Sequence, residues 1–308
     1  MALNLKEYCS RIEPGQMQRC RNIAVVPLFL REEAKLDYLT LKEALGRKCA
    51  VVSEVGVEGS VPELLVDVEE GVNVLILDGE ELYGARQNRV LNASIFLRGK
   101  SRTVVPVSCS EQGRWHAVSR SFYDSGHQAD YAMRAAKNMS VSQSLRAGRK
   151  YHSDQGIVWD CISDLQLKAK VMSRTRAMRD IYVDKKAELD EYIEKFRPLP
   201  GQRGLLVFVN GEAAGLDLVS REAAYRVYHE KLLRSYCIHA VYEAKQDGRE
   251  PDAGKVHDFL DFAASSRVYS YKSVGVGDDY RLEGRRYNGS ALEVDGEVLH
   301  LSFLAERR

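Results

Sequence analysis

The sequence contains no apolar run long enough to cross a membrane. Its longest apolar runs, IAVVPLFL at 23–30 and GLLVFV at 204–209, have the length of β-strands. A membrane-spanning helix needs roughly 20 apolar residues. The N-terminal segment MALNLKEYCSRIEPG lacks a basic stretch followed by an apolar one, so it does not resemble a signal peptide. We therefore expect a protein without membrane segments.

The sequence also lacks an excess of either charge. Its formal net charge is +1, so no global field attracts nucleic acid or anionic lipid, and we expect neither as a partner. The six cysteines occur singly and lack the close spacing of zinc ribbons or thioredoxin-like motifs: Cys9, Cys20, Cys49, Cys109, Cys161 and Cys237. This scatter predicts buried, reduced thiols in a cytoplasmic protein.

Motifs for common cofactors are missing. There is no Walker loop, and the glycines at 275 and 277 do not form a dinucleotide fingerprint. His116, His127 and His152 do not form a metal-ligand spacing with Cys109, so we expect no metal site. The sequence therefore contains no motif that identifies a cofactor.

The composition is that of a globular protein, with 44% hydrophobic and 29% charged residues. The first part, to about residue 120, is predicted to be rich in β-strands, at 23–30, 49–54, 62–68, 72–78, 89–97 and 102–108, with one helix at 37–45. The middle part is predicted to be helical, at 128–148, 153–175 (with Ser153 as N-cap) and 184–196.

The segment RPLPGQRG at 197–204 is the best candidate boundary, because it holds two prolines and two glycines. After it, the sequence predicts an Asn-Gly hairpin at 204–219 and a helix at 220–244 that is capped by Ser220. A second helix is predicted at 254–266, and an Asp-Gly hairpin at 290–304. We expect an α+β protein: residues 1–200 form a β-rich and then helical part, and 201–308 form a hairpin-helix-sheet unit that shares a core with the first or folds beside it.

The densest polar cluster is GEELYGARQNRVLN at 79–92, between two apolar segments. If 89–97 is a strand, Asn88 and Asn92 project from one face and Arg89 projects from the other. The strand at 102–108 ends in a second polar group that includes Glu111, Arg114 and Trp115. If these two strands form a hairpin, we expect the second group to approach the turn at 87–89.

Two interpretations of this cluster are open from the residues alone. In the structural interpretation, Glu80 or Glu111 pairs with an arginine, and the amides satisfy loop backbone groups. In the functional interpretation, the cluster binds a ligand that carries hydroxyls and phosphates, and Trp115 stacks on it. Glu80 and Glu111 are also candidates for an acid–base pair, whereas Cys109 is better explained as a core residue than as a nucleophile.

The two polar stretches and the segment 204–240 resemble the ARG and rhodanese-phosphatase-superfamily-associated protein domain family. Gln155 and Trp159 in SDQGIVW are similar to a further element of that family. The positions that match the first family signature are Glu80, Gly84, Gln87, Asn88, Arg89, Asn92, Cys109, Glu111, Gly113, Arg114 and Trp115.

The resemblance implies a context of NAD or ADP-ribose metabolism and ADP-ribosylglycohydrolase-type partner enzymes. We therefore expect a module that binds a nucleotide-derived ligand, with Arg89 or Arg114 on phosphate, Asn88 and Asn92 on hydroxyls. The remaining candidate contacts are Gln87, Cys109, Trp115 and Gln155. The alternatives are a hydrolase with Glu111 or Glu80 as general base, and a non-catalytic scaffold.

Overall fold

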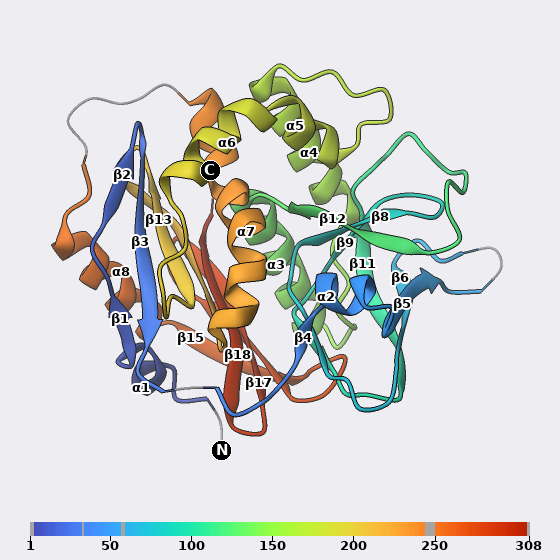
Figure 1. Ribbon diagram of the computed structural model, residues 1–308, viewed down its shortest axis with the longest axis horizontal. Helices are drawn as coiled ribbons and strands as arrows, with labels where there is room; N and C mark the ends of the chain where they lie inside the picture. Colours follow the sequence, from blue (N-terminus) through green and yellow to red (C-terminus); the bar gives the residue numbers. More distant parts are fainter. Residues whose placement is uncertain (1–2, 33, 57–58, 244–249, 307–308) are drawn as a thin grey trace.

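The computed structural model describes residues 3–32, 34–56, 59–243 and 250–306. The chain is an α+β protein, as predicted, with a β-rich beginning, a helical middle and a C-terminal hairpin-helix-sheet unit (Figure 1). None of the helices in the described part combines the length and apolarity that a bilayer span requires.

The largest sheet is antiparallel and joins the two ends of the chain. β3 (Ile23–Leu30) pairs with β13 (Gly204–Val209), so the N-terminal strands extend the C-terminal sheet. Its strand order is β1 (Ile12–Pro14), β3, β13, β14 (Glu212–Val219), β18 (Glu297–Ala305), β17 (Tyr287–Val294), β16 (Asp278–Glu283) and β15 (Arg267–Lys272), with β2 (Gln18–Cys20) paired to β3. Both predicted hairpins are present, and their turn residues Asn210-Gly211 and Asp295-Gly296 have the positive φ that such turns require.

A second sheet carries the polar cluster of the sequence. Its order is β12 (Phe122–Gln128), β8 (Glu80–Gly84), β9 (Arg89–Leu91), β11 (Ser101–Cys109), β6 (Glu63–Val68) and β5 (Ala50–Glu54). A small third sheet is formed by β10 (Ile95–Leu97), β7 (Val74–Ile76) and β4 (Leu39–Thr40).

The prediction of a single strand at 89–97 is wrong, because the segment divides between two sheets. The chain leaves the first ladder at residues 92–94, where side chains form other hydrogen bonds. The Asn92 amide donates to the Tyr151 carbonyl, and the Ser94 hydroxyl accepts from the Asp78 N–H. β8 lies within the polar cluster and has no apolar run to predict it.

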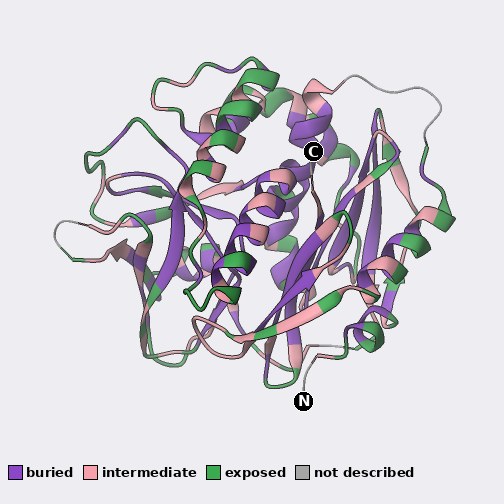
Figure 2. Cartoon of the chain, turned by 180° about the vertical axis from the view of Figure 1, so that it is seen from behind, coloured by how far each residue is buried: buried purple, intermediate pink, exposed green. Residues whose placement is uncertain are grey.

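The helices are α1 (Leu5–Cys9), α2 (Leu41–Gly46), α3 (Tyr131–Arg146), α4 (Gln155–Ala169), α5 (Met178–Asp184), α6 (Lys186–Lys195), α7 (Glu222–Tyr242) and α8 (Ala253–Ala264). α3 and α7 lie between the sheets (Figure 1), and one apolar cluster contains residues from β3, α3, α7 and β18. The buried residues follow the strands and these two helices, whereas α4 to α6 carry much exposed surface (Figure 2).

Two predicted helix caps are wrong. The N-cap of α4 is Asp154, whose carboxylate accepts from the Gly156 N–H at 2.8 Å, and not Ser153. The Ser220 hydroxyl does not cap α7, because it forms a hydrogen bond with the Tyr38 hydroxyl at 2.7 Å. α4 also ends at Ala169, where Lys170 adopts a left-handed conformation, rather than at 175, and residue 244 of the predicted 220–244 helix lies outside the described residues.

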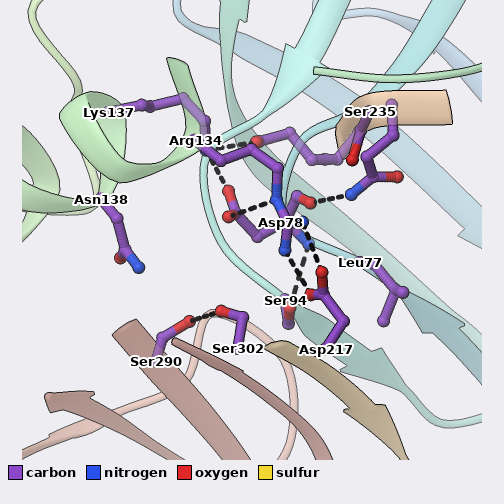
Figure 3. Close-up of polar contacts among 12 residues, drawn as sticks. Leu77, Asp78, Ser94, Arg134, Lys137, Asn138, Asp217, Ser235, Ser290 and Ser302 are labelled. Atoms are coloured by element: carbon purple, nitrogen blue, oxygen red, sulfur yellow. Dashed lines mark hydrogen bonds and ion pairs between the residues drawn. The ribbon is translucent and has the colours of Figure 1, made fainter. Parts of the chain in front are cut away.

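A buried charge network connects α3 to both large sheets (Figure 3). Arg134 donates to both carboxylate oxygens of Asp217 on β14, at 2.9 and 2.6 Å, and Lys137 pairs with Asp78. His300 and Tyr236 also bond to Asp217, at 3.2 and 2.7 Å. The sequence analysis did not predict this network. Its sign in the sequence is a pair of cations on one face of an Ala-rich helix. Because every charge in it is buried, its stability depends on each partner being present.

Candidate functional site

The polar cluster folds as β8, a tight turn and β9, in the middle of the second sheet. On β9, Arg89 lies opposite Leu82 of β8 and opposite Cys109 of β11. Residues directly opposite one another in an antiparallel pair share a face of the sheet. Arg89 and Cys109 therefore project from the same face, while Val90 projects from the other together with its partners Glu81 and Ser108.

The expected approach of residues 111–114 to the turn at 87–89 is observed. The Glu111 carboxylate accepts from Arg114 at 2.9 and 2.7 Å and from the Asn88 N–H at 3.3 Å. Arg114 also donates to the Asn88 side chain at 2.9 Å, and the Gln87 amide donates to the Glu111 carbonyl. These buried groups satisfy one another, so Glu111, Arg114 and Asn88 act as a clasp that holds the turn.

Asn92 lies away from Arg89. Its carbonyl oxygen accepts from the Ser108 hydroxyl at 2.8 Å, and Ser108 projects from the face opposite Arg89. Gln155 of α4 binds the backbone of Cys109 with two hydrogen bonds, at 2.7 and 2.9 Å. The hydrogen bond to Ser108, and not strand alternation, therefore separates Asn92 from Arg89, because Asn92 lies beyond the end of β9. One small ligand cannot contact both from the same side of the sheet.

Glu80 belongs to another network. It accepts from Lys231 of α7 at 2.7 Å and from the Leu77 N–H at 2.6 Å, and Lys231 also pairs with Asp124 at 2.8 Å. Burial raises the pKa of Glu80, while Lys231 opposes that effect. Glu80 and Glu111 are thus each held by a different cation in a different network.

Arg89 differs from every other candidate because part of its guanidinium group is unpaired. Its side chain is fully buried, and Nη1 donates to the carbonyl and side-chain oxygens of Gln87, both at 3.0 Å. Nε and Nη2 have no hydrogen-bond partner in the described part of the chain. These two nitrogens form the edge that binds both oxygens of a carboxylate or phosphate. Leaving these two buried donors without an acceptor is unfavourable.

Within the described residues no group accepts a hydrogen bond from this edge, although the nearby carboxylates of Glu54 and Glu111 raise the pKa of Arg89. Burial raises the pKa of the Cys109 thiol, more than Arg89 lowers it, so this thiol is neutral near pH 7. Burial also lowers the pKa of Arg89, which still remains a cation. The guanidinium lies 5.7 Å from the centre of the Trp115 ring, and Arg86 lies 6.0 Å from the same ring. Trp115 is 47% exposed, so this aromatic ring faces solvent.

The structure adds one titratable residue that the sequence analysis did not single out. Glu81 is fully buried, and one of its carboxylate oxygens accepts from the Ser110 hydroxyl at 2.8 Å. Burial raises the pKa of Glu81 to about 7. The sequence contains a sign of this difference in the pair Glu80-Glu81. Neighbouring residues on a strand project from opposite faces, so the two carboxylates lie in different environments.

Comparison with known families gives a match over residues 11–304 to the model of the ARG and Rhodanese-Phosphatase-superfamily-associated Protein domain. The matched range contains the whole polar cluster and all three sheets' central strands. No curated protein matches, and no solved structure matches.

Proposed function

The chain belongs to the ARG and Rhodanese-Phosphatase-superfamily-associated Protein domain family, and we propose that it binds a nucleotide-derived ligand that carries phosphate. The observation that supports this proposal most strongly is the unpaired Nε–Nη2 edge of the buried Arg89. An anion on this edge would provide two charge-assisted hydrogen bonds to donors that otherwise lack an acceptor.

Trp115 provides the second contact of the proposed site. An exposed tryptophan offers a flat surface on which a nucleobase can stack, a contact worth roughly 1–3 kcal/mol per base. It lies beside the Arg89 and Arg86 guanidinium groups. An aromatic ring next to an arginine edge suits a ligand with a base at one end and a phosphate at the other.

The clasp residues have a supporting role in this proposal. Glu111, Arg114 and Asn88 bond to one another and fix the turn that precedes Arg89. The hydrolase alternative assigns the general base to Glu111 or Glu80, yet both are ion-paired. We therefore propose a binding module rather than a hydrolase.

The ADP-ribose component of the proposal comes from the family context. The family name associates this domain with ARG and Rhodanese-Phosphatase-superfamily proteins. We propose ADP-ribose or NAD as the ligand class, and an ADP-ribosylglycohydrolase-type enzyme as a partner that acts on the same chemistry.

Titration calorimetry with ADP-ribose and with NAD tests the proposal. We expect the wild-type protein to bind at least one of them. Trp115→Ala should weaken binding by about tenfold, which corresponds to the loss of about 1.4 kcal/mol of stacking. Tyr123→Ala is the matched control, because Tyr123 is also an exposed aromatic residue, 55% accessible, and lies outside the proposed site.

Arg89→Lys tests the anion contact, because lysine keeps the charge but lacks the two-nitrogen edge. This variant should bind at least tenfold more weakly while its circular dichroism spectrum stays that of the wild type. The proposal would be refuted by the absence of heat with both compounds, or by wild-type affinity in Arg89→Lys.

A further inference from the structure

A hollow lies between α3, α4 and the end of α7, and neither Arg89 nor Trp115 lines it. Its volume is about 980 Å³, near the upper end of the range for small-molecule sites, roughly 300–1,000 Å³. The apolar part of the wall comes from one face of each of two helices: Met133, Ala136 and Met139 on α3, and Ile157, Cys161 and Leu165 on α4. Such a wall suits the apolar body of an organic molecule.

A hydrogen-bonded relay of three side chains borders the same hollow. Asp130, the N-cap of α3, accepts from His239 Nε2 at 2.7 Å, and His239 Nδ1 is 2.6 Å from the Tyr242 hydroxyl. Burial raises the pKa of Asp130, but the hydrogen bond and charge of His239 outweigh it, so the pKa is lowered and the carboxylate stays ionised. An ionised carboxylate only accepts, so His239 carries a proton on Nε2.

The Tyr242 hydroxyl can accept a hydrogen bond whichever way it bonds to His239. A hydroxyl oxygen has two lone pairs, so one is left for another donor even where His239 Nδ1 donates to it. Tyr242 therefore offers an acceptor for a cationic N–H group at the edge of the hollow.

The charges around the hollow have the matching sign. Asp160, Asp164, Glu243 and Glu306 contribute to its lining, whereas Lys168 is its one lysine or arginine among the described residues. Lys168 is itself neutralised by Asp164, at 2.5 Å. The excess of carboxylates favours a cation and disfavours an anion in the hollow.

We propose that this hollow is a binding site for a small organic cation, with the ammonium group on Tyr242 and the apolar body between α3 and α4. The site is independent of the proposed nucleotide site, because Arg89 and Trp115 do not contribute to its wall.

The test uses two probes with the same indole body and opposite charge, tryptamine and indole-3-propionate. Titration calorimetry on the full-length protein should show binding of tryptamine, and at least tenfold weaker binding of indole-3-propionate. Tyr242→Phe removes only the hydroxyl and should weaken tryptamine binding by about tenfold. Tyr269→Phe, at a partly exposed tyrosine on β15, is the matched control and should bind as the wild type does.

Asp160→Asn gives a second test that does not depend on the core, because Asp160 is exposed. It should also weaken tryptamine binding and leave the melting temperature unchanged. Absence of tryptamine binding, equal affinity for both probes, or identical behaviour of Tyr242→Phe and Tyr269→Phe would overturn the proposal. Binding of ADP-ribose should be unaffected by Tyr242→Phe, so failure at one site is distinguishable from failure at the other.

Discussion

Arg89 and Arg114 both lie beside the turn at 87–89, but their guanidinium groups differ in their hydrogen-bond partners. Arg114 places its Nε–Nη2 edge on Glu111, whereas the same edge of Arg89 is unpaired. The sequence predicts that both lie near the turn at 87–89, and the structure agrees. Which arginine is left without a carboxylate depends on strand register and on a contact between loop residues, and neither can be deduced from residue types.

The raised pKa of Glu81 predicts that the stability of the protein depends on pH. The pKa of this carboxyl is raised by burial from 4.5 to about 7, so the folded protein binds a proton that the unfolded chain releases in this range. The stability contributed by the protonated form is present below pH 4.5 and is lost as pH rises through 7. The change is about 3 kcal/mol. Glu81→Gln should remove this dependence, so the variant should gain stability relative to wild type between pH 5 and pH 8.

Urea denaturation at the two pH values measures this difference. Parallel stability curves for the wild type and Glu81→Gln would show that the Glu81 carboxyl does not titrate in this range.

The stability of the Glu111→Gln variant distinguishes a structural role of Glu111 from a catalytic one. Glu111→Gln leaves Arg114, which is 7% exposed, without its carboxylate. Removing one partner of a buried ion pair costs about 3–5 kcal/mol. Asp164→Asn is the control, because it breaks the exposed Asp164–Lys168 pair, and such pairs contribute about 0–1 kcal/mol.

Thermal denaturation should therefore show a large decrease in melting temperature for Glu111→Gln and a small one for Asp164→Asn. If Glu111→Gln instead kept wild-type stability and abolished turnover of an ADP-ribose conjugate, the hydrolase alternative would replace the present account.

At the scale of elements, predictions succeeded where local chemistry determines the structure. β3 was predicted with its observed bounds, because a strand-length apolar run favours burial within a sheet. Both hairpins followed from Asn-Gly and Asp-Gly turns. β8 was not predicted, because its buried carboxylates Glu80 and Glu81 are stabilised by Lys231 and Ser110 from distant elements. A buried polar strand can be predicted only when its partners are known.

The same limit explains the divided strand at 89–97. Its apolar residues satisfy the strand pattern throughout, yet Asn92 and Ser94 find partners in Tyr151 and Asp78. Side-chain hydrogen bonds of this kind compete with the regular ladder, and the outcome depends on which groups tertiary structure brings near.

At the scale of the whole molecule, the parts 1–200 and 201–308 are connected by strand pairing and by buried charge. β3 from the first part pairs with β13 from the second, and Arg134 of α3 binds Asp217 of β14. Separating the parts would expose unpaired strand edges and leave buried charges without partners. We therefore expect the protein to unfold as one cooperative unit.

Hydrogen exchange in increasing urea measures this cooperativity. Amides of β9 in the first part and of β13 in the second should approach a common opening free energy. Complete exchange of β9 while β13 stays protected would contradict a shared core.

The arginine Nε–H signals in an NMR spectrum show whether the unpaired edge of Arg89 receives an anionic ligand, as we propose. The Arg89 signal can be assigned as the one missing from Arg89→Lys. On titration with ADP-ribose, we predict that this signal shifts and saturates, while the Nε–H signal of Arg114, already bonded to Glu111, stays in place. An Arg89 signal that does not move at saturating ADP-ribose, or that moves only together with all other arginine signals, would contradict the account.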